Sequence, residues 1–353
     1  MTPRENLLNL LRRQGYEAVP VRFDLCHSLQ WEFKNRYGTS RAYEELFSFP
    51  FRYIAAALAK SDCDWRIYYS DLKEGTVFDS WGVAHEPGSA EAKHMLRMHH
   101  PLESCSSLNT MGEYPFPDYS GLDLNAITQQ VNSMHKRGLA AVAQMEATIW
   151  ERAWYLRGML PLMVDMQTDN EKAEWLLDKV TQQACIKAEN FAKAGTDIIF
   201  IGDDIGMQNS LMMSEQMYRK WLKQRLSKVI SHAKSVKSDI LIHYHSCGFV
   251  FPLISDLIET GIDILNPVQP ERMDFEELHK QFGACLSFSG TIGTQSTMPF
   301  GSPDDVRQLT NKNLRIAGKK GGLLCSPTHL LEPEVTWDNI EAYVQACQEY
   351  KHY

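Results

Sequence analysis

One short stretch of the chain combines residue types that bind soft metal ions. His243, His245 and Cys247 alternate with Tyr244 and Ser246 in an apolar run that ends at a glycine. Side chains alternate between the two faces of a strand, so we expect the two histidines and the cysteine on one face. Imidazole and thiolate ligands favour zinc over magnesium or calcium. The pattern therefore predicts a zinc site at the end of a buried strand.

Spacing gives the members of this stretch different roles. His245 and Cys247 lie two residues apart at the strand end and can share one ion. His243 lies roughly 6.6 Å from His245, further down the strand, so it is less suited to reach the same ion. We expect His243 to contact the substrate or to orient a ligand.

Other ligands of this ion must come from other strand ends. The candidates are His329, which we take as the predicted third ligand, Cys325 and Glu146. A water molecule could hold an open fourth position, as in catalytic zinc sites. The alternative is that all of these residues are hydrogen-bonded polar groups in a cavity without metal.

Carboxylates that follow predicted strands are candidates for proton transfer. The predicted catalytic residues are Glu146, Asp203 and Asp204. The alternative for the aspartates is that one caps a turn by accepting backbone N–H groups. The alternative for Glu146 is a salt bridge to Arg152 or Arg157. The predicted substrate-binding residues, which stand at further strand ends, are His243, Asn266, Gln269 and Gln295.

The elements that carry these residues alternate in type along the chain. Apolar runs of strand length are separated by helical patterns, which implies parallel strands joined by right-handed crossovers. The eight predicted strands are 17–24, 64–69, 139–146, 197–204, 239–248, 262–269, 286–290 and 321–326. Eight such units favour a (β/α)8 barrel, whose working residues lie at the carboxyl ends of its strands. A doubly wound open sheet is the alternative, but no glycine-rich nucleotide turn follows the first strand.

The amino-terminal third adds features outside the regular alternation. A capping box at Thr2 and Glu5 predicts a helix that precedes the barrel. Residues 43–59 have a helical pattern interrupted at Pro50. After the second predicted strand, residues 77–85 predict a hairpin and residues 86–119 a long loop. We expect one domain over residues 1–353.

Composition limits the class of protein. The chain has 353 residues and a net charge of -8, so it lacks the basic footprint of a nucleic-acid-binding protein. The sequence shows no apolar run long enough for a membrane span and no apolar core of a signal peptide. Its eight cysteines are scattered, which is typical of a reducing cytosol, and we expect a cytoplasmic protein.

Several ordered motifs resemble the uroporphyrinogen decarboxylase superfamily, and most closely its branch of cobalamin-related methyltransferases. These motifs are Phe200–Gly206, Ser214–Arg219, His245–Gly248, Asp263–Pro270, Gly321–Pro327, and also Glu151–Gly158. The resemblance extends from about residue 140 to the carboxyl terminus, and residues 79–83 are similar too. It implies the same (β/α)8 barrel that the strand count favours.

The resemblance also implies a zinc site. The methyltransferase branch holds zinc with a His-x-Cys pair, which His245 and Cys247 match, and with a later cysteine, whose place corresponds to His329. Gly293 stands where relatives often carry aspartate. True uroporphyrinogen decarboxylases carry an arginine-rich motif after the first strand, where residues 23–28 of this chain read Phe-Asp-Leu-Cys-His-Ser.

Three hypotheses for function follow. The first is a zinc-dependent methyltransferase that moves a methyl group between a small methylated substrate or thiol and a corrinoid (cobalamin) bound to a partner protein. The second is a metal-independent decarboxylase or lyase that uses strand-end carboxylates. The third is a binding or docking barrel without turnover. The sequence does not set the oligomeric state, and a homodimer is among the states it allows.

Overall fold

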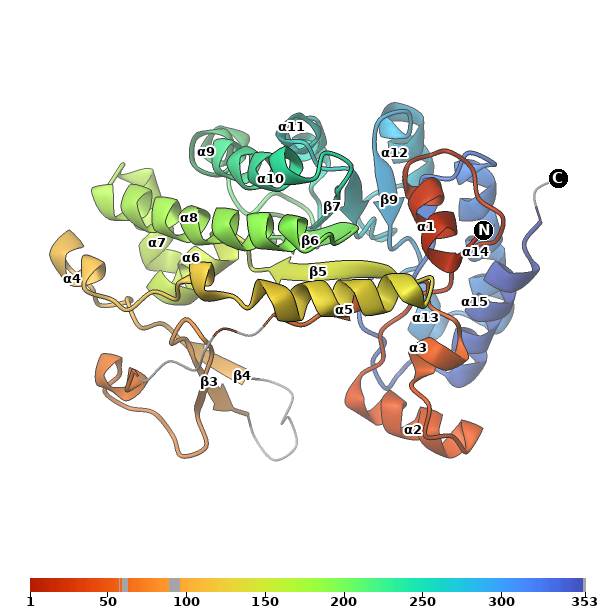
Figure 1. Cartoon of the computed structure of the whole chain (residues 1–353), viewed down its shortest axis with the longest axis horizontal. Helices are drawn as coiled ribbons and strands as arrows, with labels where there is room; N and C mark the ends of the chain where they lie inside the picture. Colours follow the sequence, from red (N-terminus) through yellow and green to blue (C-terminus); the bar gives the residue numbers. More distant parts are fainter. Residues whose placement is uncertain (57, 59–62, 89–95, 352–353) are drawn as a thin grey trace.

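The computed structural model describes residues 1–56, 58, 63–88 and 96–351. Its centre is a curled parallel sheet of seven strands in which each strand pairs with the next one along the chain (Figure 1). The strands, in sheet order, are β1 (Phe51–Ile54), β5 (Ala140–Glu146), β6 (Ile198–Gly202), β7 (Leu241–His245), β8 (Ile264–Asn266), β9 (Ser287–Ser289) and β10 (Leu323–Leu324). The carboxyl ends of these strands therefore meet on one side of the molecule.

The segment before α2 lies between the two edges of this sheet. Leu25 forms a parallel bridge with Leu331, which follows β10. On the other side, Arg22 Nη2 donates a hydrogen bond of 3.0 Å to the Tyr53 hydroxyl of β1. Phe23 is buried on the outer face, whereas Arg22 and Asp24 line the interior cavity. Residues 17–24, predicted as the first strand, form no regular strand, but the segment occupies the remaining position of the predicted (β/α)8 arrangement.

Helices surround the sheet on its outer face (Figure 1). Apolar residues at helical spacing bury one face of each long helix against the strands; α8 and α10 lie side by side. The helices are α1 (Pro3–Leu11), α2 (His27–Tyr37), α3 (Tyr43–Leu46), α4 (Leu108–Gly112), α5 (Leu124–Lys136), α6 (Trp150–Arg157), α7 (Met159–Gln167), α8 (Glu171–Lys193), α9 (Glu215–Tyr218), α10 (Gln224–Val236), α11 (Ile254–Thr260), α12 (Phe275–Phe282), α13 (Thr297–Phe300), α14 (Pro303–Ala317) and α15 (Trp337–Glu349). No helix in the described ranges is both long and apolar enough to cross a membrane.

Helix α1 closes the amino-terminal end of the barrel. Its start is fixed by the predicted capping box between Thr2 and Glu5. Its leucines, Leu7 and Leu11 among them, form a separate buried cluster with inward-facing residues from the lower parts of the strands, such as Phe51. This packing leaves the carboxyl ends of the strands as the side on which a cavity can open.

Two predictions about the early strands were wrong. Residues 64–69 form a 3₁₀ turn, η1 (Trp65–Tyr68), and the strand β1 lies instead within the stretch predicted to be helical. Helix α3 ends before Pro50, and the residues after Pro50, Phe51–Ile54, pair with β5. Within 64–69 only Trp65 is buried, so the alternation in the sequence does not correspond to a buried strand face. The remainder of the predicted helix falls partly outside the described residues.

The insertion follows the second barrel position, as predicted. It contains a small antiparallel sheet of β2 (Val77–Phe78), β3 (Ala84–Pro87) and β4 (Leu96–His99). The predicted hairpin at 77–85 is confirmed. The long segment predicted at 86–119 includes residues 89–95, which are outside the described part, and otherwise contains β4, α4 and a short turn, η2 (Tyr119–Gly121).

Candidate metal centre and its cavity

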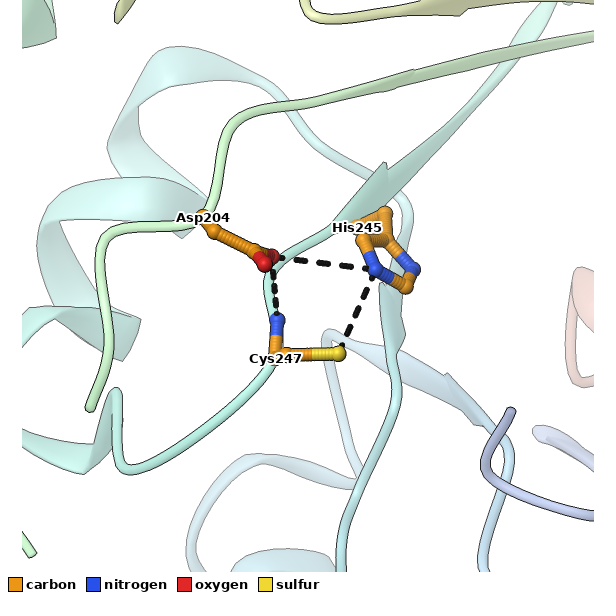
Figure 2. A group of neighbouring side chains, drawn as sticks. All are labelled: Asp204, His245 and Cys247. Carbon is orange, nitrogen blue, oxygen red and sulfur yellow. Dashed lines mark hydrogen bonds and ion pairs between the residues drawn. The ribbon is translucent and has the colours of Figure 1, made fainter. Parts of the chain in front are cut away.

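Three potential metal ligands converge at the carboxyl ends of β6 and β7 (Figure 2). One ligand atom each from Asp204, His245 and Cys247 lies within 4.8 Å of the other two. Cys247 Sγ is 3.5 Å from His245 Nε2, and that nitrogen is 3.7 Å from Asp204 Oδ1. The group supplies one sulfur, one nitrogen and one oxygen, a donor set that suits a catalytic zinc ion with an open position.

The imidazole of His245 is oriented for this role by Asn266. His245 Nδ1 is 2.7 Å from Asn266 Oδ1, which can only accept, so we assign the ring proton to Nδ1. In the neutral ring, Nε2 then presents its lone pair toward Cys247 and Asp204. Such a second partner fixes the tautomer of metal-binding histidines. Asn266, predicted to contact substrate, lines the main cavity at this end of the barrel and also holds the His245 ring in place.

Close backbone contact fixes the two loops that carry the ligands. A Cβ atom on Gly206 would lie 2.6 Å from the carbonyl oxygen of Cys247, and one on Gly248 would lie 2.6 Å from that of Met207. Gly248 also has a φ of +85°. The Cys247 N–H donates to Asp204 Oδ1 at 2.7 Å. The side chains of Asp204 and Cys247 are therefore brought together by the backbone before any ion binds.

Asp203 and Asp204 are adjacent but do different work. The Asp203 carboxylate is buried and accepts the N–H groups of Ile149 and Glu151, at 3.0 and 2.9 Å, at the start of α6. Burial raises the pKa of Asp203 to about 7, and these hydrogen bonds act against that rise. This arrangement is the turn-capping alternative, and it points the Asp203 carboxylate away from the metal ligands. The Asp204 carboxylate faces the cavity.

The main cavity, of about 540 Å³, is lined by Asp204 and His245, and Cys247 lines a neighbouring cavity that Asp204 also lines. Both arginines in the wall of the main cavity are already paired: Arg22 with Asp24 at 2.5 Å, and Arg152 with Asp79 at 2.7 Å. Glu146 accepts from the Gln144 amide at 2.6 Å, so the alternative of a salt bridge to Arg152 or Arg157 does not hold.

Glu151 adds a further carboxylate to this wall. It accepts a hydrogen bond from the Tyr155 hydroxyl at 3.0 Å. Burial and the nearby Asp203 and Asp204 raise the pKa of Glu151 to about 8. In the described part of the chain, Glu146, Glu151 and Asp204 form no ion pair with lysine or arginine. The cavity therefore has an excess of negative charge that a metal cation would offset.

The cysteine in this group is protonated in the absence of a cation. Burial, followed by Asp204 and Glu151, raises the pKa of Cys247 to about 12. A bound divalent cation reverses such effects, because it stabilises a coordinating thiolate.

His329 lies on the cavity rim and not within the three-ligand group. It lines the cavity with His245, and it also lines a second cavity of about 510 Å³ beside Cys247. Its ring keeps contact with solvent, while surrounding protein atoms and His245 lower its pKa. Asp204, predicted as catalytic, occupies the position in the group where the sequence suggested His329. Cys325, the other candidate, is buried and contacts the Thr291 hydroxyl at 3.7 Å.

The other predicted substrate contacts lie at different depths. His243 is buried below the ligands against Phe200, with a ring separation of 4.6 Å, and its Nε2 has no hydrogen-bond partner among the described residues. Burial and Arg22 lower its pKa well below the usual value. Gln269 accepts the Gly248 N–H at 2.7 Å, which supports the Cys247 loop. Gln295 lines the second cavity and contacts Arg272 at 3.4 Å.

Sequence reasoning missed four residues of the cavity wall: Arg22, Glu151, Arg152 and Tyr155. Arg22 could have been found, because it alternates with Val21 and Phe23 in the first predicted strand and so faces inward. The other three lie on α6 within the motif Glu151–Gly158, but neither the motif nor their spacing predicts that they line the cavity.

The chain is similar to one protein family and to several solved structures. Residues 122–350 match the family described as Uroporphyrinogen decarboxylase (URO-D). A search of curated proteins finds no match. Among solved structures, a methyltransferase from Methanosarcina mazei is similar over 99% of both chains, with a TM-score of 0.71 and 19% identity. A B12-independent methionine synthase from Shewanella is less similar: it has a TM-score of 0.39 and 15% identity over 64% of this chain and 63% of its own.

Proposed function

From the premise that this chain belongs to the uroporphyrinogen decarboxylase family, we propose that it is a zinc-dependent methyltransferase. The observation that carries the proposal is the convergence of Asp204, His245 and Cys247, the first two of which line a cavity with excess negative charge. The likeness in fold to the Methanosarcina methyltransferase supports it. The methyl group would pass between a small molecule in the cavity and a corrinoid on a partner protein.

The chain's own residues prepare the site. Asp204, His245 and Cys247 would hold zinc, and Asn266 keeps the lone pair of His245 Nε2 directed at it. Zinc there would supply Lewis acidity, which either lowers the pKa of a substrate thiol or polarises a substrate oxygen. His329 lines both cavities beside these ligands, so it could contact a molecule bound in either.

Glu151 is placed for proton transfer in this cavity. Its raised pKa, about 8, leaves a carboxylic acid that can give or take a proton near neutral pH. We propose this role for Glu151 beside Glu146, whereas Asp203 serves to hold the start of α6.

A decarboxylase that grips several substrate carboxylates needs unpaired cations around its cavity. Here Arg22 and Arg152 each have an acidic partner, and two carboxylates without a lysine or arginine partner, Glu146 and Asp204, share the wall in the described part of the chain. The charge balance of the main cavity therefore favours the methyltransferase over the polycarboxylate decarboxylase.

A metal measurement combined with a methyl-transfer assay tests the proposal. We expect about one zinc per chain by elemental analysis of the purified protein. Free cob(I)alamin with methylated ethers, amines or thioethers, or methylcobalamin with thiols, replaces the partner, and the change in cobalamin absorbance reports transfer. Cys247→Ala should lose both the zinc and the activity.

The matched control is Cys285→Ala, since Cys285 is an exposed thiol at the other end of the barrel. It should keep zinc and activity. Activity in zinc-free protein would refute the zinc proposal. A zinc-loaded chain that transfers no methyl group in any pairing, with a corrinoid partner protein included, would favour a docking barrel without turnover.

A further inference from the structure

A third, small cavity adjoins the main one, and its wall carries two cations, Lys187 and Arg152, and one carboxylate, Glu146. It measures about 30 Å³ and shares Glu146, Ala147 and Arg152 with the wall of the main cavity. At 10–15 Å³ for each water-sized group, it has room for roughly two such groups. Its far wall is formed by Lys187 from α8 and by Tyr119.

Lys187 is a cation without an anion. Its Nζ lies 5.2 Å from the centre of the Tyr119 ring and 5.9 Å from that of Phe191. Among the described residues it forms no hydrogen bond and no ion pair, although its stem is packed within the protein. Burial and the neighbouring Arg152 lower its pKa to about 8, and no carboxylate offsets them. A partly buried ammonium with three unused donors is costly unless a ligand accepts from it.

Arg152 presents further unused donors at the same place. Its guanidinium lies over the rings of Trp81, at 5.2 Å, and Tyr155, at 5.4 Å. Nη1 donates to Asp79, whereas Nε and Nη2 have no partner in the described residues. The side chain is only 15% exposed, so these donors are fixed in direction. Planar guanidinium donors suit the two oxygens of a carboxylate.

We propose that the Lys187–Arg152 cavity binds the carboxylate of the methyl-bearing small molecule. The two groups that the cavity can hold match the two carboxylate oxygens, and it is too small for a tetrahedral phosphate with its substituents. The excess negative charge near Asp204 repels the same carboxylate, so the molecule is oriented with its methyl-bearing end toward the metal ligands. That this molecule is the methyl substrate rests on the proposed function; the anion site does not.

Matched pairs of ligands test the proposal on the purified full chain. Methoxyacetate is compared with 2-methoxyethanol, and N,N-dimethylglycine with 2-dimethylaminoethanol, by ligand-observed NMR titration. Each pair shares its methyl-bearing end and differs in the carboxylate. We expect each acid to bind roughly tenfold or more tightly than its alcohol, as hydrogen bonds to charged groups imply. Lys187→Met should remove that preference.

Lys179→Met is the matched control. Lys179 lies on the same helix and also over an aromatic ring, Phe116 at 5.9 Å, but it does not line the cavity. It should bind the acids as the unaltered chain does. Lys187→Gln repeats the test in case the methionine variant does not fold, and unchanged alcohol binding shows that a variant is intact.

The proposal is overturned if acids and alcohols bind equally, if no acid binds, or if both Lys187 variants keep the preference. Methyl transfer is not read in this titration. A failure here therefore leaves the zinc methyltransferase standing, and absent methyl transfer with intact acid binding leaves the anion site standing.

The pH dependence of acid binding gives a second measurement. Arg152, Glu146 and Tyr119 are the charged or titratable groups that share the cavity with Lys187. The Lys187 ammonium has a pKa of about 8, and so does Glu151 in the adjoining main cavity. Binding of methoxyacetate should weaken as the pH rises from 7 to 10, and this trend should be smaller in Lys187→Met than in Lys179→Met. A flat profile in the unaltered chain contradicts the role of Lys187.

Discussion

Strand β6 has aspartates at both ends, and the protein neutralises them differently. Asp197, directly before the strand, accepts from Arg4 of α1 at 2.7 Å and from His135 of α5 at 2.9 Å. Asp203 and Asp204, directly after it, accept backbone N–H groups. The amino-terminal end is a closed set of ion pairs, whereas the carboxyl-terminal end keeps negative charge without a cation.

The difference separates stability from function along a single strand. At Asp197 burial raises the pKa, but hydrogen bonds from Arg4, the Ala141 N–H and His135 outweigh it and lower the pKa overall. At the other end burial dominates, and the pKa of Asp203 is raised to about 7. A barrel places its working residues at the carboxyl ends of its strands, where a bound ligand can neutralise unpaired charge.

Removing the charge at Asp204 should have the largest effect, and on the metal. Asp204→Asn should weaken zinc binding by more than about 100-fold, the most that loss of an outer partner costs. The zinc-free variant should unfold at the same or higher urea concentration than the zinc-free unaltered chain, because a carboxylate without a cation is removed. Competition with a chromophoric chelator measures the first quantity and urea denaturation the second. Unchanged zinc affinity would show that Asp204 is not a ligand.

The same substitution at the other end of β6 should act on stability alone. Asp197→Asn should lower the free energy of unfolding by about 2–4 kcal/mol, somewhat less than for a fully buried pair because Arg4 keeps solvent contact. Zinc content should not change. Asp239→Asn, which removes a mostly exposed partner of Arg12, is the control and should stay within about 0.5 kcal/mol. If Asp197→Asn and Asp204→Asn changed the free energy of unfolding and the zinc content equally, the two ends of β6 would not differ in role.

The residues at the carboxyl-terminal end could be predicted from the sequence only in part. His245-x-Cys247 was identified because alternation along one strand settles which side chains point together. Asp204 was noticed but given a proton-transfer role, since its place beside Cys247 depends on two loops in close backbone contact. His329 was favoured as a ligand by resemblance, yet the rim position that it takes depends on the chain after β10.

Asn266 offers a smaller test of the carboxyl-terminal end. Asn266→Ala removes the acceptor of the His245 Nδ1 proton and should weaken zinc binding roughly tenfold, at the low end for such partners. Chelator competition measures the change. Asn209→Ala, on an exposed loop, is the comparison variant and should leave zinc affinity unaltered. An unchanged affinity in Asn266→Ala would mean that the Cys247 loop alone orients the site.

The smallest expected effect is the pH dependence of the contribution of Asp197 to stability. Because the pKa of Asp197 is lowered in the folded chain, its contribution to stability is complete above the unfolded pKa of about 3.9 and is lost as the pH falls through the folded value. The difference in unfolding free energy between the unaltered chain and Asp197→Asn should therefore shrink as the pH falls from 6 to 2. Urea denaturation across that range measures it. Parallel curves would contradict the role of the Arg4 and His135 bonds.

Fold prediction failed where local pattern and long-range pairing disagree. The four residues of β1 follow Pro50 within a helical pattern, and only pairing with β5 makes them a strand. Residues 64–69 alternate like a strand, but they pair with no strand in the described part of the chain and form the turn η1. The later strands were predicted well because each is a continuous apolar run between helices, which burial on both faces requires.

Helix α1 has a consequence for the order of events in a catalytic cycle. Its leucines fill the amino-terminal end of the barrel, so in the described part of the chain the cavity is reached from the other end. If the proposed corrinoid protein covers that end, it would shut the only approach seen among the described residues for a small molecule. The small molecule would then enter before the partner docks and leave after it departs. Steady-state kinetics should show compulsory ordering, with excess partner acting as an inhibitor of the first entry step.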